Sequence, residues 1–261
     1  MQRRNNWADA DVERGERLAR KAYKELKLRH PLEASLEAIA LLRGARVVNL
    51  PLDGALGRLV RKGKKAILTV SDRIPFPERR RFVIAHELGH HELHEKVMQL
   101  DVCDEAKIDE VYDQATEREA NAFAAEFLMP AALWKKHVDV AQPTFEVIAA
   151  RAREYQVSLT SAAIRFVKLS PERCAIAFVN DRQVAWSVSS DDLWQRVRRG
   201  RVVGSFTRAV DYWEKGRVPA EPEEVPASAW FDRPDADDVI EQVRPVPSLN
   251  SALVLLWFRS E

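Results

Sequence analysis

The sequence has few cysteines, no long apolar run and almost no excess of charge of either sign. Its two cysteines, Cys103 and Cys174, are too few for a disulfide framework, which excludes the small disulfide-rich secreted domains. The longest apolar run, residues 252–258, is far shorter than the roughly 18 residues of a membrane span. The sequence has 41 Lys and Arg against 40 Asp and Glu, a net charge of +1. So small a net charge argues against electrostatic binding of nucleic acid by the surface of the molecule as a whole.

What is present is the composition of an ordinary globular protein, with 46% hydrophobic and 31% charged residues, which excludes the disordered class. A chain of 261 residues suffices for one large domain or two modest ones. Its first residues are charged throughout and lack the apolar stretch of a signal peptide. We therefore expect a soluble cytoplasmic protein with reduced thiols and no membrane contact.

The spacing of apolar and turn residues predicts an α+β protein. Helices are expected at residues 11–28, 32–42, 77–95 and 116–128, with two more between 143 and 169. We expect a β-hairpin with strands at residues 55–60 and 66–70 and Gly63 in its turn. Strands are also expected within residues 174–188 and at residues 252–258. The composition changes after Ser170-Pro171, so we expect three segments: residues 1–140, 141–170 and 171–261.

One motif carries chemistry: His86-Glu87-x-x-His90 lies inside the helix predicted at residues 77–95. Residues four apart share a helix face, so both imidazoles can bind one zinc ion. Glu87 follows the first ligand and can accept a proton from metal-activated water without being a ligand itself. Two histidines at a buried helix end also need polar partners, and a metal supplies them.

Catalytic zinc usually has three protein ligands, and the third has to come from another segment. His94 lies eight residues from His86, roughly 12 Å along the helix axis, which is too far for a shared ion. The helix at 116–128 offers Glu117, which we favour, and Glu119 as its rival. On the same helix Asn121 can bind the ring nitrogen of a ligand histidine that faces away from the metal.

Two blocks of this sequence, residues 80–94 and 117–130, resemble the ImmA/IrrE metallopeptidases when they occur together in this order. The resemblance covers about residues 10–170. It implies a mainly helical, thermolysin-like core with a small antiparallel sheet whose edge strand aligns a peptide. It also implies zinc at His86, His90 and Glu117, with Glu87 as the catalytic base.

The resemblance further implies a metalloendopeptidase of bacterial stress responses and mobile elements, which cleaves a helix-turn-helix (XRE-type) repressor at one site. The cofactor expected is Zn²⁺, with Mn²⁺ as the alternative, because ligand type alone does not select between them. A donor to the tetrahedral oxyanion is still required, and His94 and Tyr112 are the candidates.

The helices after the motif have the pattern of a helix-turn-helix, whose outward positions offer few basic residues. These outward positions are expected to be Ser158, Thr160, Ser161, Arg165 and Lys168. Direct DNA binding is therefore not favoured, although a non-catalytic zinc-containing regulator that binds DNA or a repressor remains the alternative function. Residues 171–261 are expected to form a separate α+β domain, which some relatives have as a GAF- or PAS-type sensor.

Overall fold

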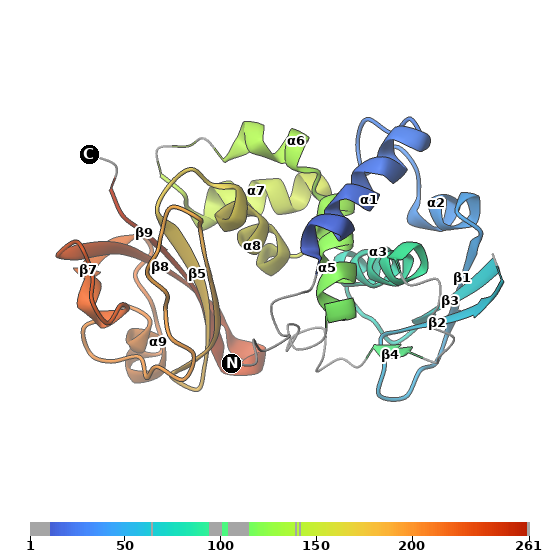
Figure 1. The fold of residues 1–261 in the computed structure, drawn as a ribbon. Coiled ribbons are helices and arrows are strands. Elements are labelled where there is room, and N and C mark those ends of the chain that lie inside the picture. The colour runs from blue at the N-terminus through green and yellow to red at the C-terminus, as the bar shows by residue number, and fades with distance from the viewer. Residues whose placement is uncertain are drawn as a thin grey trace, which may run out of the picture. The chain divides into compact units, whose positions relative to one another are not determined.

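The computed structural model describes residues 11–63, 65–93, 101–103 (backbone only), 115–138, 140 and 142–259. The chain divides into two compact units, Met1–Pro130 with Tyr155–Ser158, and Ala131–Glu154 with Leu159–Glu261. Each unit combines helices with one sheet, which confirms the α+β class (Figure 1). The division of roles among residues 1–140, 141–170 and 171–261 stays a prediction.

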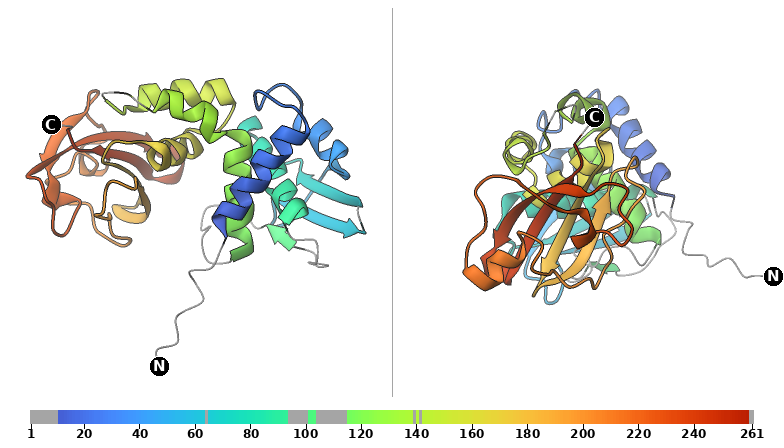
Figure 2. Two further views of the ribbon diagram at one scale, coloured as in Figure 1. Left: turned by 45° about the horizontal axis from the view of Figure 1, so that its top comes forward. Right: turned by 90° about the vertical axis from the view of Figure 1, so that its left-hand side faces the viewer.

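Within the described residues, the first unit has four helices: α1 (Val12–Glu25), α2 (Leu36–Leu42), α3 (Pro77–Leu93) and α5 (Ala115–Leu128). Side chains cap two of them, since Asp11 accepts from the backbone N–H of Arg14, and Ser35 from that of Ala38. Helix α5 packs against both α1 and α3 (Figure 2). Two glycines permit this close approach, because a Cβ on Gly15 would lie 2.4 Å from the carbonyl oxygen of Glu119, and one on Gly89 would lie 3.0 Å from that of Ala120.

The first sheet has the order β1-β3-β2-β4, with β1 (Ala45–Leu50), β2 (Gly57–Lys62), β3 (Lys65–Ser71) and β4 (Asp101–Cys103). The expected hairpin is β2 and β3, and Gly63 in its turn has φ of +62°. The sheet is mixed rather than wholly antiparallel, because β1 runs parallel to β3. The tight hairpin already occupies one side of β3, so β1 pairs with the other side, in the direction opposite to β2.

The second unit contains the remaining helices and a five-stranded antiparallel sheet of order β6-β5-β9-β8-β7. The strands are β5 (Cys174–Asn180), β6 (Gln183–Ser189), β7 (Glu223–Pro226), β8 (Asp238–Val246) and β9 (Ser251–Trp257). The helices are α6 (Ala131–Trp134), α7 (Phe145–Tyr155), α8 (Leu159–Leu169) and α9 (Val210–Lys215), and the 3-10 turns are η2 (Lys135–His137), η3 (Ala227–Ala229) and η4 (Pro247–Leu249).

Local sequence explains the main features of this sheet. Asp181 and Arg182, between β5 and β6, both have positive φ, as a two-residue type I′ hairpin turn requires. Every residue of β9 is buried, so both faces of this central strand are covered, and its continuous apolar run follows from that. None of the helices within the described residues is long and apolar enough to cross a lipid bilayer.

The pair α7 and α8 lies where the helix-turn-helix pattern predicted two helices. One expected outward position is wrong, because Arg165 is only 4% exposed. Helix α8 packs against β5 and β6, and five of its residues, Arg165 among them, are buried. Lys168 is the one exposed basic residue of α8.

A buried carboxyl group lies in the core of the second unit. Glu241 on β8 is 1% exposed and accepts hydrogen bonds from the backbone N–H of Ala209 at 2.6 Å and from Nε1 of Trp230 at 2.9 Å. Burial raises the pKa of Glu241 to about 7, although these hydrogen bonds act in the opposite direction.

The raised pKa predicts a pH-dependent stability. The folded state holds the Glu241 proton more tightly than the unfolded chain, whose ordinary pKa is 4.5. This contribution is full below pH 4.5 and is lost as the pH rises through about 7. We expect it to reach about 3 kcal/mol of unfolding free energy, and Glu241→Gln to remove it. Urea unfolding between pH 5 and pH 8 measures it, with the half-exposed Glu224→Gln as control. Parallel pH profiles for wild type and Glu241→Gln would contradict the prediction.

Candidate metal centre

Helix α3 brings the motif residues into a buried position. It begins at Pro77, where a missing N–H costs nothing, and Val83, Ile84 and Leu88 are fully buried on it. A helix enclosed on all sides places its polar residues away from water too. The side chains of His86 and Glu87 are 0% exposed, and His90 is 2% exposed.

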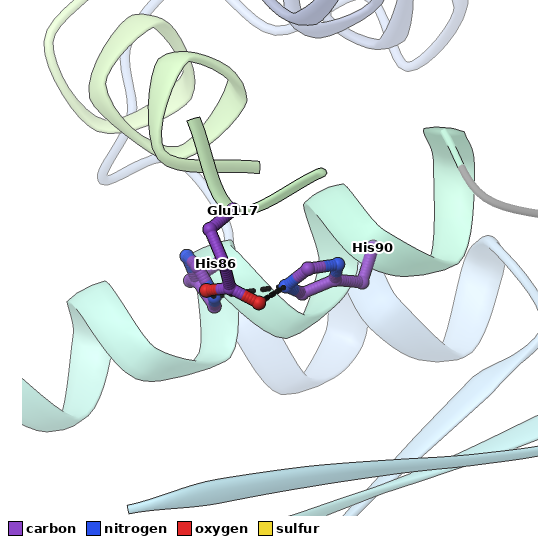
Figure 3. Close-up of side chains that lie close together, drawn as sticks. All are labelled: His86, His90 and Glu117. Atoms are coloured by element: carbon purple, nitrogen blue, oxygen red, sulfur yellow. Dashed lines mark hydrogen bonds and ion pairs between the residues drawn. The ribbon is translucent and has the colours of Figure 1, made fainter. Parts of the chain in front are cut away.

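Glu117 on α5 completes a cluster with the two histidines of α3 (Figure 3). Its Oε2 lies 3.3 Å from Nε2 of His86, and its Oε1 lies 3.3 Å from Nε2 of His90. The two Nε2 atoms are 3.0 Å apart. One atom from each of the three residues therefore lies within 4.8 Å of the others, from two helices separated in sequence.

The donor set fits a zinc ion in type and in spacing. Zinc–nitrogen and zinc–oxygen bonds of about 2.0–2.1 Å in a tetrahedron put neighbouring ligand atoms roughly 3.3 Å apart. The separations of 3.0 and 3.3 Å here are close to that value. Two imidazoles and one carboxylate form a three-ligand set of the kind found in hydrolytic zinc sites.

The charges of the site also call for a cation. Burial would raise the pKa of Glu117, but hydrogen bonds from His86 and His90 outweigh it and hold that pKa well below its usual range. Burial likewise opposes a charge on His86, yet Glu117 and Glu87 raise its pKa. Two carboxylates beside two buried imidazoles thus favour a positive charge between them, which a divalent metal can supply.

Asn121, one turn beyond Glu117 on α5, contacts the far side of the first histidine. Its Oδ1 lies 3.0 Å from Nδ1 of His86. An amide oxygen only accepts, so this contact requires a proton on Nδ1, and when the ring is neutral its lone pair is on Nε2, directed at the cluster. This is the partner arrangement that orients a metal-binding histidine.

Loss of this contact is expected to weaken metal binding. In Asn121→Leu the Nδ1 proton has no acceptor and the ring loses its preferred tautomer, so we expect the affinity for Zn²⁺ to fall about 10–100-fold. Competition with a chromophoric chelator measures the change. Asn121→Asp is the matched control, because it keeps an acceptor oxygen at the same place. Wild-type affinity in Asn121→Leu would show that the contact does not support the site.

The other sequence candidates lie outside the cluster. Glu119 is turned toward α1, where it accepts from the backbone N–H of Asp11 at 3.1 Å and lies 3.5 Å from Nη1 of Arg14. His91, which follows the second histidine of the motif and was not a candidate, is held by structural contacts: its Nε2 donates to the carbonyl oxygen of Arg43, and Arg61 donates to its Nδ1. His94 and Tyr112 fall outside the described residues.

One close neighbour of the site was missed by sequence reasoning. Gly57, the first residue of β2, lies against the carboxyl group of Glu87. The two residues are thirty positions apart and belong to different elements, so no local pattern could have joined them.

Comparison with known proteins places this site in a peptidase family. Residues 42–167, which include both cluster helices, match the Peptidase_M78 family profile, described as the IrrE N-terminal-like domain. A solved Mycobacterium tuberculosis transcriptional regulator shares the fold, with a TM-score of 0.60 and 16% identity over 93% of this chain and 87% of that chain. No curated protein matches the sequence. The match over residues 42–167 bears out the resemblance that the two sequence blocks predicted, to the metal-dependent peptidases with an IrrE N-terminal-like domain.

Proposed function

We propose that this protein is a zinc-dependent, site-specific endopeptidase that cleaves a helix-turn-helix repressor. The observation that carries the proposal is the convergence of His86, His90 and Glu117, with Glu87 on the same buried turn of α3. A purely structural zinc site usually has four protein ligands and needs no adjacent carboxylate. Three ligands among the described residues, beside a buried glutamate, instead suit a hydrolytic site with one open position.

Each residue has a role in the proposed reaction. His86, His90 and Glu117 would hold the zinc ion, which would supply Lewis acidity toward a peptide carbonyl and toward a water molecule. Glu87 accepts the proton that this water loses and later delivers it to the leaving amine. Asn121 keeps the His86 ring in its metal-binding tautomer. His94 and Tyr112 stay candidates for the oxyanion donor.

The proposed substrate is a protein that controls transcription, as the family membership supports. Cleavage of an XRE-type repressor at one site would release stress-response or mobile-element genes. The name of the Mycobacterium tuberculosis relative, a transcriptional regulator, also supports a link to gene control. Zinc is proposed ahead of manganese because two imidazoles and one carboxylate are an ordinary zinc donor set.

A non-catalytic regulator is the second candidate, since helices α7 and α8 retain the helix-turn-helix pattern and the relative carries a regulator's name. The exposed surface of α8 offers DNA little positive charge, because Arg165 is buried and Lys168 is its one exposed basic residue. Contacts between basic residues and phosphates supply most of the affinity for DNA. The shortage of exposed basic residues on α8 therefore favours the peptidase over the DNA-binding regulator.

Cleavage of a purified helix-turn-helix repressor, encoded beside this gene, tests the proposal. The zinc-loaded protein is expected to produce one discrete cut, and a chelator is expected to abolish it. Readdition of Zn²⁺ after the chelator should restore the cut. An intact repressor after incubation with protein that holds stoichiometric zinc would count against the peptidase, and retention of that repressor in a pull-down would then favour the regulator.

A further inference from the structure

Gly57 occupies a place where no other residue fits beside Glu87. A Cβ at this position would lie 2.3 Å from Oε1 of Glu87 and 3.0 Å from its Cδ. It would also lie 2.9 Å from Cγ1 of Val83, one turn earlier on α3. The first distance is far below any normal contact, so with a side chain at residue 57 the Glu87 carboxyl group would have to move.

The backbone gives no other reason for glycine here. Gly54 and Gly63, on either side, have positive φ values of 69° and 62°, which favour glycine in a turn. Gly57 is absent from the residues with positive φ, and it pairs regularly with Val70. A glycine inside a strand weakens that strand and often marks a close approach of another group. At Gly57 that group is the carboxyl of Glu87.

Strand β2 is also unable to retreat from α3. It lies inside the sheet, between β3 and β4, and Gly57 is paired with Val70 on one side and with the backbone of Cys103 on the other. Glu87 is itself 0% exposed, in the stretch Val83–His91 of α3, where every residue is buried. Steric pressure at residue 57 would therefore be relieved by the side chain of Glu87 rather than by the backbone.

We infer that Gly57 is a positioning residue, whose missing side chain is the space that holds the Glu87 carboxyl group at its working place beside the two histidines. The inference rests on the proposed function for its effect on rate, but the packing itself does not. Gly57 acts through Glu87, because the atoms nearest to its missing Cβ belong to Glu87 and Val83 and not to the cluster of His86, His90 and Glu117.

Four variants of the full chain test the inference: Gly57→Ala, Val83→Ala, the double variant, and Gly204→Ala. Gly204 is the matched control, because a Cβ there would meet no atom within 4 Å and its φ is not positive. In the double variant the contact with Cγ1 of Val83 is gone, while the two contacts with Oε1 and Cδ of Glu87 remain.

With the repressor as substrate, Gly57→Ala is expected to lower kcat by about 10²-fold, the usual loss for a misplacement near 1 Å, with KM and zinc stoichiometry unchanged. The double variant should stay equally slow, and Val83→Ala and Gly204→Ala should keep kcat within about threefold of wild type. Recovery of kcat in the double variant would assign the effect to core packing at Val83 and overturn the inference. Loss of zinc from Gly57→Ala would overturn it as well.

A stability measurement tests the packing without any substrate. Gly57→Ala should lower the melting temperature, and the drop should be at least halved when Glu87→Ala is already present, because two of the three close atoms are then gone. An equal drop in melting temperature in the wild-type and Glu87→Ala backgrounds would overturn the inferred contact between residue 57 and Glu87. If wild type cuts no repressor while the two drops differ, the proposed function fails and the packing between Gly57 and Glu87 stands.

Discussion

Glu117→Gln is expected to lower the affinity of this protein for zinc strongly. Glu117 contributes the only carboxylate of the cluster, and its two oxygens lie 3.3 Å from the two histidine Nε2 atoms. If the roughly 10–16 kcal/mol of a four-ligand zinc site is shared equally, one ligand is worth about 3 kcal/mol, or on the order of a 10²-fold loss of affinity. Metal analysis after dialysis, followed by chelator competition, measures the loss.

Glu119→Gln is the matched control for this loss. It makes the same substitution two residues further along the same helix, where the side chain contacts Asp11 and Arg14. We expect Glu119→Gln to keep wild-type metal affinity. If Glu119→Gln lost zinc while Glu117→Gln held it, the third ligand would have to be reassigned.

Glu87→Gln is expected to abolish cleavage while zinc stays bound. The amide has nearly the same shape as the carboxylate but cannot accept a proton, and Glu87 is not part of the ligand cluster. A positioned general base contributes about 10²–10⁴-fold to the rate, so kcat should fall within that range. Quenched time courses of repressor cleavage, beside zinc analysis of the same sample, measure both properties.

Glu78→Gln serves as the control for Glu87→Gln, because Glu78 lies in the first turn of the same helix, remote from the cluster. It should cleave at the wild-type rate. Wild-type cleavage by Glu87→Gln would remove the proposed base and with it the peptidase mechanism. Loss of zinc from Glu87→Gln would instead give that residue a part in holding the metal.

Much of the fold could be predicted from the sequence, because its signals are local. Pro77 marks the start of α3, where a proline is tolerated at the first helical position. Gly63 and Asp181 each lie in a hairpin turn and have positive φ, which glycine and aspartate adopt more readily than most residues. The spacing of four between His86 and His90 puts both imidazoles on one helix face before any packing is known.

Other features depended on contacts between distant segments. Glu117 and Glu119 are equally acidic, but two residues on a helix differ by about 200° in direction, so only the placement of α5 between α1 and α3 separates them. The same holds for Arg165, whose exposure depends on the sheet that α8 covers. A periodic pattern describes one helix and says nothing about which neighbour lies against each face.

The sequence by itself indicated the two histidines proposed to bind metal, the proposed base and the family resemblance, because all of these depend on residues close together along the chain. Tertiary structure alone decided which carboxylate meets the histidines, that β1 runs parallel to β3, and that Gly57 makes room for Glu87. The physical reason is range: hydrogen bonds within a helix or turn join residues a few positions apart, whereas packing joins atoms that the chain keeps thirty residues apart.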